Sequence, residues 1–226
     1  MANPKAIRED RQAALDFFVD LDDDEAAVPC LLDRFEYSLE HGINDTREKE
    51  TALKGITKRG VKVLPLIRDR LQKTTRIAWP LKAVKEIGSD NDLVEVLKSC
   101  LDFNDIAFDQ AKVDKNFDIL CYLRDYQIPG FEEKVSFFLD NLDERVRFSA
   151  AEVLVEQTGT AFDIPGALER FLIDESPDNT RIRQTVTDAF VRHQWKVRNL
   201  EAFEGKSLIQ GVFLDRLNRV LKVTSR

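Results

Sequence analysis

Apolar residues along this chain recur at intervals of three and four positions, the spacing that places them on one face of an α-helix. Residues 5–21, for example, place Ile7, Leu15 and Phe18 on one helical stripe. Alternation of apolar and polar residues with a period of two, which is typical of half-buried strands, is not sustained anywhere, and 9 Gly and 7 Pro leave few tight turns. The pattern predicts an all-α protein of about eleven or twelve short helices.

The second half of the chain repeats itself at an interval of about 36 residues. Ile128-Pro129-Gly130 recurs as Ile164-Pro165-Gly166, and Val146-Arg147 recurs as Ile182-Arg183. A polar residue suited to capping a helix stands three positions before each of the two apolar–arginine pairs. An apolar–proline pair suits the first turn of a different helix, because proline has no N–H to donate and its φ is already helical. Each repeat is therefore predicted to contain two helices.

The same opening occurs earlier, where Val28-Pro29 and Leu64-Pro65 are again about 36 residues apart. We predict about five helix pairs within one continuous domain, 1–226, at residues 23–60, 61–88, 89–125, 126–159 and 160–196. Residues 1–22 are expected to form an N-terminal capping helix, and residues 197–226 are expected to form C-terminal capping helices that include 208–221. A repeat of this length indicates a solenoid, because one helix pair cannot bury its apolar face alone.

The segment from Asp143 to Gly159, DERVRFSAAEVLVEQTG, continues to Ile164-Pro165 and carries the most specific pattern of the chain. It resembles the HEAT-like repeat of the phycobilisome-lyase type. The resemblance implies antiparallel helix pairs in a right-handed superhelix, a concave face lined by the second helix of each pair, and a function in binding other proteins. It is carried best by residues 126–196, less by 23–88 and least by 89–125. Because HEAT-like repeats serve many unrelated tasks, it does not specify a chemistry.

The balance of charge changes the expected partners. The chain has 34 Lys and Arg against 41 Asp and Glu, a net charge of −7, which is the wrong sign for a domain held by duplex phosphates. Six basic and fourteen acidic residues lie in 1–50, whereas ten basic and five acidic residues lie in 178–226. The C-terminal repeats are therefore predicted to contact the acidic surface of another protein.

The basic residues of the C-terminal part gather on and just beyond the second helix of the fifth predicted repeat. That group comprises Arg181, Arg183, Arg192, Lys196 and Arg198. The candidate protein-binding residues are Arg147, Arg183, Arg192, Trp195 and Lys196. Two plainer interpretations stay open: a solvated basic face that ends the stack of repeats, and a structural role for Arg147 and Arg183. In HEAT-like repeats an arginine at this position bonds to neighbouring loop carboxylates, for which Asp143 is available.

The sequence carries no recognisable catalytic or metal-binding motif. Its two histidines, His41 and His193, are far apart, and its three cysteines form no C-x-x-C pair. The acidic run at residues 20–25 lacks the glycine and the terminal glutamate of a calcium loop, and is instead expected to cap a helix that begins near Glu25. Nucleotide-binding and hydrolase motifs such as G-x-G-x-x-G and G-x-S-x-G do not occur in the sequence. We therefore expect no catalytic residue, no metal and no cofactor.

Two enzymatic alternatives follow from the resemblance. Some HEAT-like proteins are DNA alkyl-base glycosylases, although the negative net charge of this chain opposes duplex binding. The aromatic and basic residues that would serve such a site are Trp79, Trp195, Arg147 and Arg183. Other relatives act as lyases or chaperones that attach bilin chromophores to light-harvesting proteins. Both alternatives depend on the resemblance, because no motif in the sequence specifies either reaction.

The expected location is a reducing cytoplasm. Residues 1–10 do not resemble a signal peptide, and no run approaches the roughly 18 apolar residues of a membrane-spanning helix. The cysteines lie in apolar stretches typical of a buried core. The predicted function is that of a non-catalytic adaptor, scaffold or assembly factor that presents a concave helical surface to a protein partner, with neither nucleic acid nor membrane as a partner.

Overall fold

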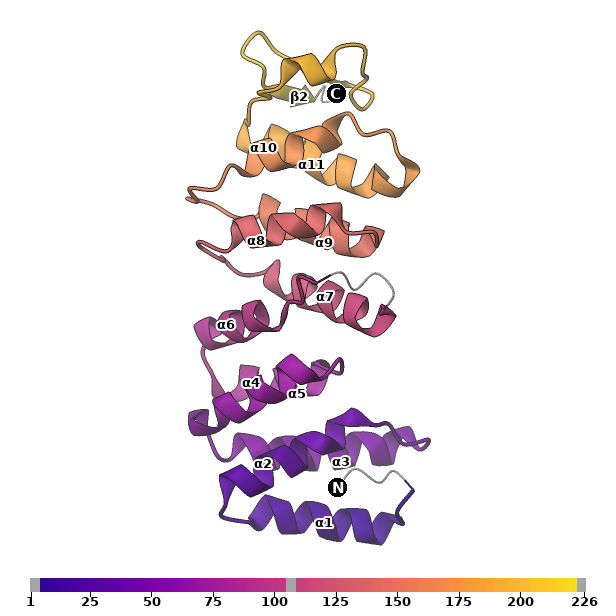
Figure 1. Cartoon of the computed structure of the whole chain (residues 1–226), viewed down its shortest axis with the longest axis vertical. Helices are drawn as coiled ribbons and strands as arrows, with labels where there is room; N and C mark the ends of the chain where they lie inside the picture. The colour runs from indigo at the N-terminus through magenta and orange to yellow at the C-terminus, as the bar shows by residue number, and fades with distance from the viewer. Residues whose placement is uncertain (1–4, 105–108, 223–226) are drawn as a thin grey trace. The chain divides into compact units, whose positions relative to one another are not determined.

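The computed structural model describes residues 5–104 and 109–222, and these residues are mostly helical (Figure 1). The all-α prediction is confirmed for them, apart from one two-stranded sheet near the C-terminus. The chain divides into two compact units, Met1–Leu101 and Asp102–Arg226. The third predicted repeat, 89–125, is split between them.

Unit 1 consists of two layers of helices. Its elements are α1 (Arg8–Asp20), α2 (Asp24–Asp33), η1 (Arg34–Glu36), α3 (Gly42–Thr57), η2 (Val61–Val63), α4 (Leu64–Lys73), α5 (Ala78–Ile87) and α6 (Asp90–Cys100). The helices α1, α3 and α5 pack side by side in one layer, and α2, α4 and α6 pack side by side in the other. The apolar stripes of both layers face each other, so a helix that joins the stack buries its stripe against neighbours on two sides.

The start of α2 confirms the capping role predicted for the acidic run. The Asp23 carboxylate accepts a hydrogen bond from the backbone N–H of Ala26 at 3.1 Å, and the helix begins at Asp24. Because this cap starts the helix early, Pro29 lies inside α2 and not at its first turn. Pro129 likewise lies in a turn before its helix, whereas Pro65 and Pro165 occupy the first turn as predicted.

A buried network of charges joins α1, η1 and α3 in unit 1. Arg34 is completely buried and donates to Glu48 at 2.8 Å and to Asp45 at 2.7 Å. Glu48 also accepts from Arg11 of α1 at 2.9 Å, and Asp45 accepts from Lys49 at 2.7 Å. Burial acts to raise the pKa of the Asp45 carboxyl, but hydrogen bonds from Lys49, from Arg34 and from one backbone N–H outweigh it and hold the pKa at about 2.

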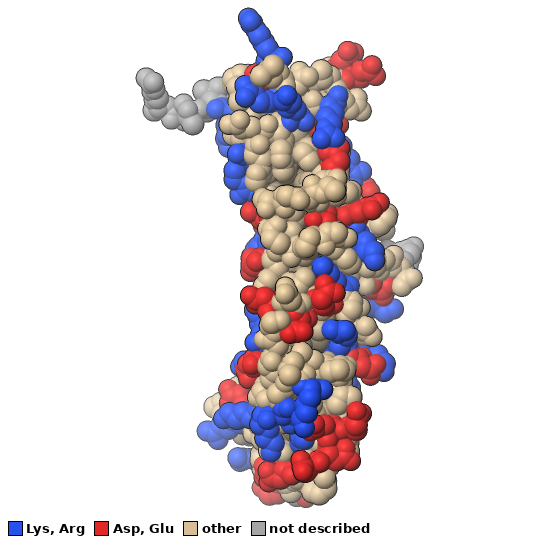
Figure 2. Space-filling model, turned by 90° about the vertical axis from the view of Figure 1, so that its left-hand side faces the viewer, with Lys and Arg blue, Asp and Glu red and all other residues tan. Residues whose placement is uncertain are grey.

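Charged side chains are unevenly placed on the face of unit 1 seen in Figure 2. Acidic side chains gather around the end that carries α1, and a group of basic side chains lies next to them. Ion pairs cross the turn between α1 and α2, where Asp24 lies 2.6 Å from Arg59 and 2.5 Å from Lys62. Lys58 lies 3.7 Å from Asp20. The basic side chains that follow α3, Lys58, Arg59 and Lys62, therefore offset part of the acidic excess of residues 1–50.

Unit 2 contains the more regular repeats and a C-terminal hairpin. Its elements are α7 (Gln110–Leu123), α8 (Glu132–Ser136), η3 (Phe137–Asp140), α9 (Glu144–Val155), α10 (Ile164–Leu168), η4 (Glu169–Leu172), η5 (Pro177–Asn179), α11 (Thr180–His193), η6 (Leu200–Phe203), β1 (Val212–Leu214) and β2 (Val220–Lys222). The longer helices α7, α9 and α11 pack side by side. The first helix of each of the last two repeats is a short α-turn that continues as a 3-10 turn.

The internal register of the repeat is visible in the core of unit 2. Residues in α9 and α11 that occupy equivalent repeat positions are completely buried together. These pairs are Val146 and Ile182, Ala150 and Val186, and Leu154 and Phe190. The two helices therefore bury the same face, as the interval of about 36 residues predicts.

The C-terminal capping helices predicted for residues 197–226 are wrong where the structure describes this segment. It forms the 3-10 turn η6 and an antiparallel hairpin in which Phe213 pairs with Leu221. The Asp215 side chain holds the hairpin turn, because it accepts hydrogen bonds from two backbone N–H groups that follow it, at 2.8 and 2.9 Å. Asn218 adopts a left-handed φ of 60°. A side chain that takes up backbone donors and a residue at positive φ both prevent a helix from continuing.

Across residues 5–104 and 109–222, no helix combines the length and the apolar character needed to cross a membrane.

We predict that Leu154→Asp unfolds unit 2. The substitution places an unpaired charge at a completely buried position, which should lower the free energy of unfolding by about 4 kcal/mol or more. Urea unfolding of the full chain, followed by circular dichroism, measures the change. The matched control is Leu142→Asp, at a site 80% exposed, which should change stability by less than about 0.5 kcal/mol. Equal stability of the two variants would show that the assigned core is wrong.

We predict that Asp45→Asn destabilises unit 1 at neutral pH but not in strong acid. A carboxyl whose pKa is lowered on folding, here to about 2, contributes stability that is complete above the unfolded-state pKa and disappears as the pH falls through the folded-state pKa. The variant should lose about 1–2 kcal/mol at pH 6, and the difference from wild type should vanish between about pH 4 and pH 2. Unfolding free energies measured over this pH range test the claim, which a pH-independent difference would contradict.

Candidate protein-binding surface

Arg147 connects the loop before its own helix, α9, to the equivalent segment before α11 in the next repeat. Its guanidinium donates to the carbonyl oxygens of Asn141 and Leu142 at 2.8 and 2.9 Å, and to the Asn179 side chain at 3.0 Å. The side chain is half-buried, so these bonds replace much of its hydration. Asp143, which the sequence offered as its carboxylate partner, bonds instead to Arg145 at 2.8 Å. The structural interpretation of Arg147 therefore fits its contacts, with carbonyl oxygens as acceptors.

Arg183 occupies the equivalent position one repeat later and is bound in a similar way. Its guanidinium donates to the carbonyl oxygen of Leu172 at 3.1 Å and to that of Ser207. These acceptors belong to the end of η4 and to the segment before the hairpin. Arg183 thus connects α11 to the loops beside it, and two of its N–H groups are already in use.

The remaining predicted residues lie at the C-terminal end of α11. Arg192 bonds to Glu156 at 2.8 Å and to the carbonyl oxygen of Val155 at 3.3 Å. Trp195 packs edge-on against Phe190 and stacks on His193, with ring centroids 5.3 and 4.7 Å apart. Lys196 is exposed and forms an isolated β-bridge with Arg219. The structure therefore brings Arg192, Trp195 and Lys196 to one end of α11, and places Arg147 and Arg183 near its beginning.

The aromatic and basic set of the glycosylase alternative is distributed over both units. Trp79 belongs to unit 1, where it stacks on Phe35 with ring centroids 5.7 Å apart. Trp195, Arg147 and Arg183 belong to unit 2, and both arginines are bound to loops as described above. In the described part of the chain, no group of three or more His, Cys, Asp or Glu side chains is placed to hold a metal ion.

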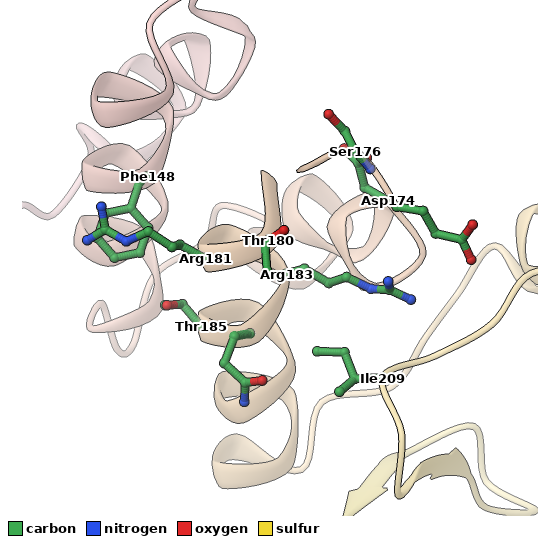
Figure 3. A pocket seen from close by; sticks show the side chains of 10 residues that line it. Phe148, Asp174, Ser176, Thr180, Arg181, Arg183, Thr185 and Ile209 are labelled. Atoms are coloured by element: carbon green, nitrogen blue, oxygen red, sulfur yellow. The ribbon is translucent and has the colours of Figure 1, made fainter. Parts of the chain in front are cut away.

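A pocket of about 490 Å³ lies beside the first turns of α11 (Figure 3). One side of it is formed by Phe148 of α9 and by Arg181 of α11, and the other side by Asp174 and Ser176. Its lining residues are Phe148, Asp174, Glu175, Ser176, Thr180, Arg181, Arg183, Gln184, Thr185 and Ile209. Of these residues, the aromatic ring and the arginines are of the kinds enriched in protein interfaces, whereas the acidic and hydroxyl side chains are not.

Arg181 is the available cation of this pocket. Its guanidinium carbon lies 3.9 Å from the centroid of the Phe148 ring, so the planar group is stacked on the aromatic face. The residue is exposed, and it forms no hydrogen bond or ion pair with any residue that the structure describes. Stacking leaves the N–H groups at the edge of the guanidinium free to donate, which suits bidentate recognition of an oxyanion.

Sequence reasoning placed Arg181 in the basic group but did not select it. A signal for it exists in the repeat, because Asn179 stands where the preceding repeat has Asp143. The acid at position 143 neutralises Arg145, whereas the amide at 179 carries no charge for Arg181. The repeat pattern thus distinguishes Arg181, which lacks the acid of the preceding repeat, from Arg145, which has it.

We predict that Arg147→Ala destabilises the fold, because the contacts of Arg147 are structural. Removing the guanidinium leaves two loop carbonyls and the Asn179 side chain without their donor, which should cost about 2 kcal/mol. Urea unfolding measures this loss. Arg216→Ala is the control, since Arg216 is exposed and has no hydrogen bond to a described residue, and its loss should be below about 0.5 kcal/mol. Similar stabilities for both variants would exclude the structural role.

Comparison of the chain with protein-family profiles, with curated proteins and with solved structures found no match.

Proposed function

We propose that this chain is a non-catalytic adaptor or scaffold that binds another protein through the exposed side of α9 and α11. The observation that carries the proposal is the Arg181–Phe148 stack, which lines the 490 Å³ pocket with its hydrogen-bond donors unused by the described residues. A guanidinium held flat on an aromatic ring is already positioned to bind. Arginine and aromatic side chains of this kind supply much of the binding energy at protein interfaces.

The proposal includes a right-handed HEAT-like solenoid as the framework of this surface. Support comes from the packing within each unit, where α1, α3 and α5, and separately α7, α9 and α11, lie side by side. It also comes from the matched burial of equivalent positions in α9 and α11. In such a framework the second helices of successive pairs line one face, and the surface formed by α9 and α11 belongs to it.

The surface is expected to bind with little rearrangement. Phe148 extends from α9, whose inward side is anchored by buried residues such as Leu154. Arg181 and Gln184 extend from α11, anchored in the same way by Val186 and Phe190. Side chains carried on helices with a shared core keep their positions better than side chains on loops, so the free surface should resemble the bound one.

We predict that a photo-crosslinking residue at Gln184 captures a specific protein partner. Gln184→p-benzoylphenylalanine places the reactive group in the pocket, and Glu133→p-benzoylphenylalanine places it on α8, at an exposed position outside this pocket. Irradiation in an extract of the source cells, followed by mass spectrometry, should give a discrete adduct with the Gln184 variant and at least tenfold less of it with the Glu133 variant.

A protein identified in this way must then bind the purified wild-type chain saturably, with a defined stoichiometry, in isothermal titration calorimetry. An adduct that forms equally from both positions, or a captured protein that does not bind when purified, would contradict the proposed function.

A further inference from the structure

Two arginines of unit 2 stack on aromatic rings in the same way. Arg145 and Arg181 are about 36 residues apart and lie at equivalent places near the starts of α9 and α11. The Arg145 guanidinium lies 5.3 Å from the ring of Phe117 on α7, and the Arg181 guanidinium lies 3.9 Å from the ring of Phe148 on α9. In both cases the arginine reaches back to the preceding long helix. The two arginines are therefore the first and second copies of one repeat position, although their aromatic partners, Phe117 and Phe148, are 31 residues apart and do not keep the 36-residue interval.

In the first copy, the arginine is neutralised by two carboxylates of the chain. Asp143 and Asp114 each accept a hydrogen bond from Arg145 at 2.8 Å. The bond from Arg145 lowers the pKa of the Asp143 carboxyl, although partial burial acts in the opposite direction. Hydrogen bonds with Asp143 and Asp114 in turn raise the pKa of Arg145. This copy shows which ligand the arrangement accepts, namely a carboxylate at the edge of a stacked guanidinium.

In the second copy, both carboxylates are replaced. Asn179 occupies the position of Asp143, and its side chain is committed to Arg147 and Asp174, at 3.0 and 2.7 Å. Asp114 stands three residues before the stacked Phe117, and the residue three positions before Phe148 is Arg145. No acid of the repeat is thus left at either of these positions to pair with Arg181.

We propose that Arg181 binds a carboxylate supplied by the partner, an aspartate or glutamate side chain, in place of the missing acids. This inference rests on the proposed function, because it takes the partner to be a protein. The 490 Å³ pocket beside the stack has room for the rest of the acidic residue and its neighbour. Phe148 and Ile209 offer apolar contact, and the Thr185 hydroxyl offers a hydrogen-bond donor, whereas the Thr180 hydroxyl already donates to the carbonyl oxygen of Pro177 at 2.9 Å.

The opposite side of the pocket limits the ligand to one acid. Asp174 lies there, bonded to the backbone N–H of Ser176 at 2.8 Å, and Glu175 beside it is exposed. Arg183 points towards this side but already donates to two loop carbonyls (Figure 3). A second carboxylate on the ligand would meet these acids, so a single acidic residue next to an apolar one fits better than an acidic run.

The Nε–H resonance of Arg181 in the full chain reports directly on this contact. Titration with the blocked dipeptide acetyl-Leu-Glu-amide should shift it saturably, while acetyl-Leu-Gln-amide should bind at least tenfold more weakly. Arg181→Lys assigns the resonance by removing it. Arg216, which is exposed and has no bond to a described residue, serves as the internal control and should show no saturable shift.

A reciprocal variant tests the comparison between the two copies. Replacing both acids of the first copy, Asp114→Asn with Asp143→Asn, should free Arg145 and make its Nε–H resonance respond to the same glutamate dipeptide. Asparagine caps helices as well as aspartate does, so α9 should keep its start. An unresponsive Arg145 in this variant would overturn the argument from the repeat.

Three results would overturn the inference for Arg181 itself. These are no saturable shift, an equal response to the glutamine dipeptide, and tighter binding of inorganic phosphate than of the glutamate dipeptide, which would make the site one for phosphate. A specific crosslink from Gln184 together with a silent Arg181 would leave the proposed function intact and remove only the carboxylate. A responsive Arg181 without any crosslinked partner would support carboxylate binding at Arg181 and contradict the proposed function.

Discussion

Backbone carbonyl oxygens at the ends of short helices need donors, and the arginine side chains of this chain supply them across the joints between helices. Arg59, just after α3, donates to the carbonyl oxygens of Phe18 and Leu21, where α1 ends. Arg192 of α11 does the same for Val155 at the end of α9. A stack of short helices exposes many such ends, and each would be costly if buried without a partner. The repeat therefore depends on arginines that reach the ends of neighbouring helices.

The part of the fold that can be predicted from sequence is the part that repeats. Equivalent positions such as Leu154 and Phe190 face the same neighbours in successive repeats, so their apolar character recurs with the repeat interval and marks the core. The C-terminal hairpin has no preceding copy to supply such a register. Its apolar spacing also fits a helix, and the decision depends on local turn chemistry at Asp215 and Asn218, where a side-chain acceptor and a positive φ outweigh the spacing.

The candidate site shows the complementary limit. Composition identifies a basic C-terminal region, but it does not distinguish an arginine that supports the fold from one that can bind a partner. Arg147 and Arg183 are used by loop carbonyls, and this follows only from the paths of those loops. Arg181 differs because its aromatic contact fixes the guanidinium plane without using its N–H groups. The replacement of both acids of the first copy, at Asn179 and at Arg145, is the trace of this difference in the sequence.

Arginine thus occurs in this chain both paired with buried carboxylates and, at Arg181, without a carboxylate partner among the described residues. In unit 1 the completely buried Arg34 is paired with Glu48 and Asp45, so its charge is compensated within the folded core. In unit 2 Arg181 is exposed, so its charge stays solvated by water. Because stacking on Phe148 has already restricted its rotamers, forming a salt bridge there loses less conformational entropy than at an unconstrained surface arginine. A preoriented cation in a repeat that lacks its own acid is thus better suited to recognition than to stability.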